Sequence, residues 1–165
     1  MRLPRLRRAL AAAYTVPVLA LTIALAGCVN FVGLDDRLDD EEVRLDRAWR
    51  DWRDLDIYDY EFVVRRDCFC DAQTQRPVRV VVRNDAIVSL TFDDTGAPVP
   101  AAYYGLYPSV EGLFGIVEDA IDQDADDLDV RYDPTYAYPR EVEIDYRHST
   151  ADEEITFRAY DFRPY

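Results

Sequence analysis

The stretch at residues 78–92, "VRVVVRNDAIVSLTF", most constrains how this chain can fold. Two runs rich in β-branched residues flank the dipeptide Asn84-Asp85, which suits the left-handed conformations of a two-residue turn. A turn this short joins only neighbouring antiparallel strands. The sequence therefore predicts a hairpin of strands 78–83 and 86–92, and with it an antiparallel sheet.

The rest of the chain shows two kinds of hydrophobic periodicity. Apolar residues recur at helical spacing within 36–55, and again after Ser109, whose hydroxyl suits the N-cap of a helix. Period-two alternation predicts further strands near 58–66, 128–133, 141–147 and 154–162. A helix followed by three strands thus occurs twice, which predicts an α+β domain with an antiparallel sheet of about six strands and two helices on one face. The same order suggests an αβββ pseudo-repeat.

The helix faces that should meet the sheet are marked by large apolar side chains. We expect Trp49, Trp52, Leu113, Phe114 and Val117 to point toward it. The two tryptophans are therefore interpreted as core residues and not as a platform for a ligand.

The N-terminus has the features of an exported lipoprotein. Residues 2–8 hold four arginines and no acid, an apolar run follows, and small residues precede Cys28, which is the order of a secretory signal peptide. The ending "LAGC" resembles the lipobox of bacterial lipoproteins, which implies cleavage before Cys28 and lipid on its sulfur. Two or more acyl chains, such as palmitate, anchor a protein stably to a membrane. We expect a signal peptide at 1–27, a lipidated tether at 28–35 and one α+β domain at 36–165.

The charge of the chain bears on its compartment and partners. The net charge is −14, and removing the four N-terminal arginines leaves 15 arginines against 33 acids, a net charge of −18. Such a chain repels nucleic acid, whose binding depends on cationic contacts with phosphate. Residue 29 is Val and not Asp, so the sorting rule for lipoproteins implies the outer membrane if the cell is Gram-negative.

The chain lacks the residues that several catalytic mechanisms require. The absence of lysine excludes a Schiff base, a P-loop and a Ser-Lys dyad. The single histidine, His148, lies in a polar turn and is interpreted as a surface residue. Carboxylates are so abundant that no pair stands out as a catalytic couple. We expect no cofactor and favour a binding or structural module over an enzyme.

One acidic run has the spacing of a calcium loop. Asp122, Asp124, Asp126 and Asp133 stand at ligand positions of an EF-hand-like segment, but its sixth position holds Asp127 where a glycine is needed. The run also leads into a predicted strand and not into a helix. We therefore interpret it as a solvated loop and expect no metal there.

Cys68 and Cys70 are the cysteines that remain once Cys28 carries lipid. Thiols in an oxidising compartment tend to pair, so a local disulfide is the first interpretation. Residues i and i+2 of a flat strand are slightly too far apart for a disulfide, so this pairing requires a bend after the first strand. A thiol-redox role and the binding of a soft metal such as Cu(I) remain open as alternatives.

Tyrosines gather in the two predicted loops that precede the second helix and follow the strand at 128–133. Tyrosine combines apolar area with a polar tip and is enriched at recognition surfaces. We therefore expect these loops to bind an envelope protein or a cell-wall partner. The residues are Tyr103, Tyr104, Tyr107, Tyr136 and Tyr138. The alternative is a purely structural role, in which the rings hold irregular loops against the sheet.

The motifs "CFC", "PVRVVVRNDAIVS", "SVEGLF" and "VRYDPTYAYP" together resemble a family of small bacterial lipoproteins catalogued as a domain of unknown function. The resemblance spans about residues 45–163. It implies the same fold and an envelope location, and it brings no established activity. The family's usual glycine before the last Tyr-Pro is Ala137 here, which questions a turn with positive φ at that point.

Overall fold

The computed structural model describes residues 35–149 and 153–165, which fall within one compact unit. The predicted signal peptide, Cys28 and the tether up to residue 34 lie outside the described residues. The helices and strands, in chain order, are α1 (Asp35–Arg53), β1 (Tyr60–Cys68), β2 (Val78–Arg83), β3 (Ala86–Phe92), α2 (Val110–Asp122), β4 (Asp127–Tyr132), β5 (Pro139–Asp145) and β6 (Glu154–Pro164). Among the described residues, no helix combines the length and apolar character needed to cross a bilayer.

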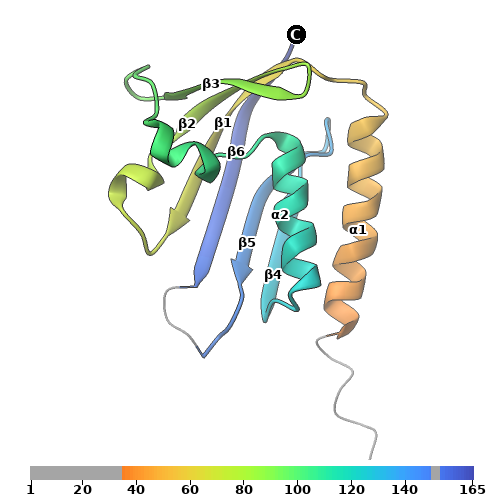
Figure 1. Cartoon of the computed structure of the whole chain (residues 1–165). Coiled ribbons are helices and arrows are strands. Elements are labelled where there is room, and N and C mark those ends of the chain that lie inside the picture. The colour runs from red at the N-terminus through yellow and green to blue at the C-terminus, as the bar shows by residue number, and fades with distance from the viewer. Residues whose placement is uncertain (1–34, 150–152) are drawn as a thin grey trace, which may run out of the picture. The chain divides into compact units, whose positions relative to one another are not determined.

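The six strands form a single sheet in the order β3-β2-β1-β6-β5-β4 (Figure 1). Every neighbouring pair is antiparallel. The predicted α+β class and the order αβββ, taken twice, are therefore present. The two halves meet where β1 pairs with β6 in the middle of the sheet, and a bulge at Asp161 interrupts this pairing.

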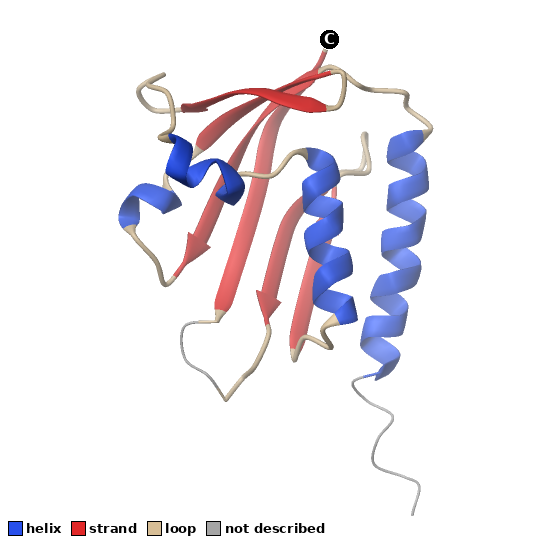
Figure 2. Ribbon diagram, in the orientation of Figure 1, coloured by secondary structure: helices blue, strands red, loops and turns tan. Residues whose placement is uncertain are grey.

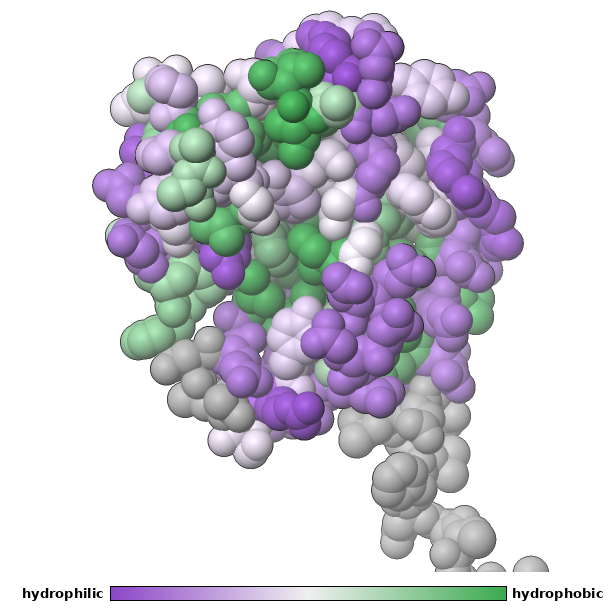
Figure 3. Space-filling view, viewed as in Figure 1, coloured by the Kyte–Doolittle hydropathy of each residue, from purple (hydrophilic) through white to green (hydrophobic). Residues whose placement is uncertain are grey.

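Both helices lie on one face of the sheet (Figure 2). Trp49 of α1 packs on Phe114 of α2, with ring centroids 4.4 Å apart, while Phe114 also stacks on Tyr132 of β4. The residues expected to face the sheet do so: Trp52, Leu113, Phe114 and Val117 are buried, and Trp49 packs against the core while staying partly exposed. In the space-filling view, hydrophilic residues dominate the helical side and hydrophobic residues gather over the edge strand β3 (Figure 3).

The helices leave the β1–β3 half of this face to two loops, one between β1 and β2 and one between β3 and α2. Two short 3₁₀ helices, Ala72–Gln75 and Ala101–Leu106, lie over that half (Figure 1). Tyr107, which is 1% exposed, holds them together, because its hydroxyl donates to the carbonyl oxygen of Thr74 at 3.3 Å. The two loops thus complete the core without a third long helix.

The opposite face of the sheet carries paired charges. Arg79 contacts the carboxylates of Glu61, Asp93 and Asp161, at 3.2, 2.9 and 2.7 Å. Arg158 pairs with the carboxylates of two neighbouring strands in the same way. Salt bridges at such exposure contribute little stability, but they compensate much of this face's negative charge.

Ala137 adopts a positive φ, although it stands where a glycine was expected. Its φ is 60°, and its N–H donates to the carbonyl oxygen of Asp133 at 2.9 Å. The Asp133 carboxylate in turn accepts the N–H groups of Thr135 and Tyr136, both at 2.9 Å. The turn is therefore built by these hydrogen bonds even though the residue has a Cβ.

Ala137→Gly should raise the free energy of unfolding by about 0.5–1 kcal/mol, because glycine adopts a left-handed conformation without the strain of a Cβ. Urea unfolding measures the change. The matched control is Ala86→Gly in β3, which should lower stability by about the same amount. A loss of stability in Ala137→Gly would mean that the turn is not strained.

Candidate functional site

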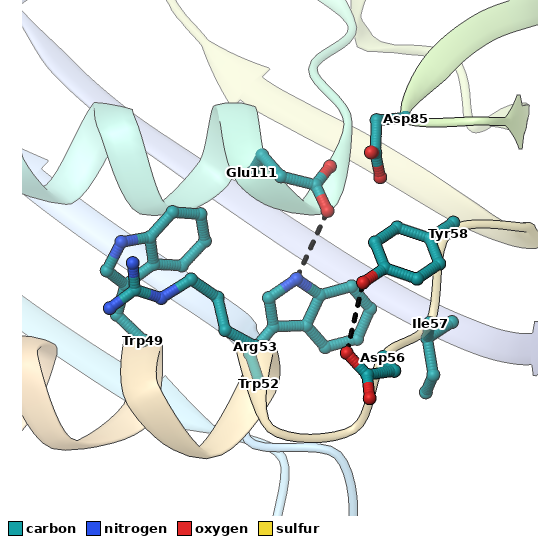
Figure 4. Close-up of a pocket in the computed structure, with 8 residues that line it drawn as sticks. All are labelled: Trp49, Trp52, Arg53, Asp56, Ile57, Tyr58, Asp85 and Glu111. Atoms are coloured by element: carbon teal, nitrogen blue, oxygen red, sulfur yellow. Dashed lines mark hydrogen bonds between the residues drawn. The ribbon is translucent and has the colours of Figure 1, made fainter.

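A cavity of about 270 Å³ lies where the end of α1 and the start of α2 approach the β2–β3 turn (Figure 4). We call it the Trp–carboxylate pocket. Its lining residues are Trp49, Trp52, Arg53, Asp56, Ile57, Tyr58, Asp85 and Glu111. They come from three parts of the chain that are distant in sequence, so no local sequence motif predicts the site.

The base of the pocket is a rigid hydrogen-bonded unit. The carboxylate of Glu111 accepts the indole N–H of Trp52 at 3.1 Å and the hydroxyl of Tyr60 at 2.7 Å. The Tyr60 oxygen accepts the N–H of Val110 at 3.0 Å, which ties this unit to the first turn of α2. Burial and the charge of Glu111 raise the pKa of Tyr60 well above its usual value. Glu111 is thus an acceptor held in place by two buried donors.

Trp52 is held by aromatic packing on its other sides. The indole ring is 3% exposed and meets Tyr60, Tyr138 and Phe162 edge-on, with centroid distances of 5.6, 6.5 and 5.6 Å. Edge-to-face contacts of this kind fix the orientation of a ring. The pocket therefore has a wall that cannot easily move.

The rim is formed by two short turns. Asp56 and Asp85 both have positive φ, at 51° and 62°. Asp85 donates its N–H to the carbonyl oxygen of Tyr58 at 3.2 Å, and Asp59 accepts the N–H of Asn84 at 2.8 Å. The hairpin tip is therefore tied to the α1–β1 loop, and the Asp85 carboxylate is held beside the pocket (Figure 4).

The charge of the lining is negative, because three carboxylates face one guanidinium. Arg53 places its guanidinium over the ring of Trp49, 5.5 Å from the centroid. The Asp56 carboxylate accepts the hydroxyl of Tyr58 at 3.0 Å, and Tyr58 is 53% exposed. Carboxylates beside aromatic rings are an arrangement that binds organic cations. No histidine, cysteine or serine is among the lining residues.

Cys68 and Cys70 are joined by a disulfide, with Cα atoms 5.3 Å apart. The bend that this pairing requires is present where β1 ends, since the N–H of Cys70 donates to the carbonyl oxygen of Cys68 at 2.9 Å. Both cysteines are half-buried, and Phe69 between them is 79% exposed. The predicted local disulfide is therefore compatible with the strand end.

The five tyrosines predicted to bind a partner do not share one exposed surface. Tyr107 and Tyr138 are 1% and 3% exposed, and Tyr103 and Tyr136 pack half-buried against the core. Only Tyr104 is largely exposed, at 52%. The four rings other than Tyr104 pack loops against the core, which is the arrangement that the alternative interpretation described. Partner binding through these five residues stays a prediction.

Other predicted surface residues take part in turns. His148 is exposed, and hydrogen bonding to the Asp145 carboxylate raises the pKa of its imidazole. Asp126 accepts the N–H of His148 at 2.8 Å, and Asp133 caps the turn before Ala137. Within residues 35–149 and 153–165, no group of three or more metal-binding side chains converges on one point.

The pocket was missed at the level of sequence because its signals are weak individually. Glu111 lies in the first turn of α2, where the helix dipole alone would explain an acid. Asp85 looked like a turn residue, and Trp49 like a core residue. The signal that could have found the site is the pairing of tryptophans at the end of one helix with an acid at the start of the next.

A comparison with protein-family models identifies the family to which the chain belongs. Residues 44–164 match the family of unknown function DUF6174, so the protein belongs to that family. No curated protein matches the chain. No solved structure matches it either.

Proposed function

We propose that the protein is a lipid-anchored envelope protein whose domain binds a cationic group of a partner, an amine or a guanidinium, in the Trp–carboxylate pocket. The role is binding and not catalysis. The observation that carries the proposal is the pocket itself, in which three carboxylates, Trp49 and Tyr58 line one cavity.

The size of the cavity supports a small occupant. Sites for drug-sized ligands usually span about 300–1,000 Å³. At about 270 Å³, the pocket suits a single basic side chain or a simple amine. An exposed lysine or arginine of an envelope protein offers such a group.

The electrostatics support a cation. Arg53 already rests on Trp49, so the pocket accepts a guanidinium against an aromatic face within its own chain. The lining keeps a net negative charge with Arg53 included. The net charge of −18 expected for the mature chain adds a long-range attraction for basic partners, which salt weakens.

The test is a titration of the mature protein in detergent with three amides: Nα-acetyl-lysine amide, Nα-acetyl-arginine amide and Nα-acetyl-norleucine amide. The chain has two tryptophans, both in the pocket, so tryptophan fluorescence reports on this site. We expect the two basic amides to bind with a Kd near the millimolar range and norleucine amide not to bind. Added salt should weaken the binding.

Asp85→Asn should weaken the binding of lysine amide by about three- to tenfold, because a charge is lost while asparagine keeps the left-handed turn. The matched control is Asp39→Asn, an exposed acid near the other end of α1 that changes the net charge equally. Equal effects of the two substitutions, or equal binding of norleucine amide, would refute the site.

The anchor is tested separately. Cys28→Ser should abolish labelling of the protein by an alkyne fatty acid and leave the precursor uncleaved, because the thiolate is the group that is alkylated. Cys68→Ser is the matched control and should leave labelling unchanged. Labelled Cys28→Ser protein would contradict the lipid anchor without bearing on the pocket.

A further inference from the structure

We propose that the Cys68–Cys70 disulfide exchanges with the dithiol of an envelope protein, and that Cys70 is the sulfur that leaves when an incoming thiolate attacks Cys68. This activity is independent of the proposed cation site. It rests on the different surroundings of the two sulfurs.

Arg66 distinguishes Cys70 from Cys68. Its guanidinium lies 3.9 Å from Sγ of Cys70. Most arginines of the strands form salt bridges with acids, yet within the described part of the chain Arg66 has no carboxylate within 4 Å. A cation kept free beside a sulfur stabilises a thiolate there.

Thr74 adds a second donor to the same sulfur. Its Oγ1 lies 3.2 Å from Sγ of Cys70 and 2.7 Å from the carbonyl oxygen of Asp71. The hydroxyl can therefore turn from that carbonyl to the sulfur when the sulfur becomes negative. Within the described residues, Cys68 has no hydrogen-bonding side chain at its sulfur.

The disulfide is also open to a partner. Both cysteines are half-buried, so neither is sealed in the core, and Phe69 projects between them with 79% of its surface exposed. An exposed phenylalanine beside a disulfide offers an apolar contact to an incoming protein. The ring closed by Cys68 and Cys70 is so small that it removes little entropy from the unfolded chain, and stability alone explains it poorly.

The exchange proceeds in two balanced steps. A thiolate of the partner attacks Sγ of Cys68, a bond forms between these two sulfurs, and the Cys68–Cys70 bond breaks with its electron pair on Cys70. The partner's second thiolate then attacks the partner sulfur of the mixed disulfide and releases Cys68 as a thiolate. Two electrons pass from the partner dithiol to the domain, and the two protons lost by the partner end on Cys68 and Cys70. The sulfur whose thiolate is better stabilised is the better leaving group, and the contacts of Arg66 and Thr74 assign that role to Cys70.

Glutathione is the probe for the first step. The mature protein in detergent is mixed with reduced glutathione, quenched with N-ethylmaleimide and digested with trypsin. Fragment masses of the peptide that holds residues 67–79 then place each group. We expect glutathione on Cys68 and the alkyl group on Cys70. Glutathione mainly on Cys70, or no adduct at all, would overturn the proposal.

Arg66→Gln tests the cause. Reduction of the disulfide by dithiothreitol should slow by about three- to tenfold, because the leaving thiolate loses its cation. Arg65→Gln is the matched control, since Arg65 is the exposed neighbour that pairs with Asp67 on the other face, and its rate should not change. Equal rates in wild type and Arg66→Gln would show that Arg66 does not act on Cys70 and would refute the assignment.

Discussion

Trp52→Ala should lower the free energy of unfolding by about 3–5 kcal/mol, the largest effect we expect from one substitution. Trp52 is 3% exposed and packs edge-on against three aromatic rings, so alanine leaves a cavity among them. The substitution also deprives Glu111 of one of its two buried donors. Urea unfolding followed by circular dichroism measures the loss.

Trp49→Ala is the matched control for this result. Trp49 lies one turn earlier on the same helix and contacts Phe114, but it is only half-buried. Its removal should cost about 1–2 kcal/mol, because less apolar area leaves the core. A cost for Trp52→Ala no larger than that for Trp49→Ala would contradict the core described above.

Alkaline pH should unfold the domain cooperatively at about pH 11–12. Burial raises the pKa of Tyr138 to about 12. Burial and a neighbouring glutamate raise the pKa values of Tyr60 and Tyr132 further. In the unfolded chain each phenol ionises near its ordinary pKa of about 10.

The direction follows from proton binding. Above about pH 10 the native state keeps protons that the unfolded state has lost, so stability is intact below that pH and falls as the pH rises toward the folded pKa values. Each of the three phenols contributes a slope of about 1.4 kcal/mol per pH unit, or roughly 4 kcal/mol per pH unit together. At this slope a domain with about 5–8 kcal/mol of stability, the lower part of the ordinary range, unfolds within one to two pH units above pH 10.

Phenolate absorbance and circular dichroism, recorded together, measure this transition. We expect exposed tyrosines such as Tyr58 to ionise first and the buried ones to ionise only with unfolding. Tyr138→Phe should make the fall of the unfolding free energy with pH about a third shallower, because one of the three titrating phenols is removed. The substitution should disturb the fold little, since the Tyr138 hydroxyl has no side-chain hydrogen bond within the described residues. Ionisation of Tyr60, Tyr132 and Tyr138 in a folded protein would contradict the burial of these rings.

The parts of the fold that follow from local chemistry are the ones that the sequence predicts best. The strands 78–83 and 86–92 have their expected bounds, because Asn84 and Asp85 adopt positive φ, at 49° and 62°, in the two-residue turn. The second helix begins after Ser109, whose hydroxyl accepts the N–H of Gly112 at 3.1 Å. A turn and a cap act within four residues, so the sequence alone reveals them.

The parts that depend on distant contacts are the ones that the sequence predicts poorly. The first strand was expected from residue 58, but β1 begins at Tyr60 and runs to Cys68, because pairing with β6 extends its end. Tyr58 therefore belongs to the pocket rim. The pocket needs α1, α2 and the hairpin tip to meet, and only the folded chain brings them together.

The most direct test of the cation site observes the two indole N–H groups by NMR in isotope-labelled mature protein. The account predicts that Nα-acetyl-lysine amide shifts the Trp49 and Trp52 indole signals with one shared, saturable Kd, because both rings line one cavity and Trp52 donates to Glu111 within it. Nα-acetyl-norleucine amide should leave both signals in place. Indole signals that do not respond to lysine amide, or that respond equally to norleucine amide, would contradict the account.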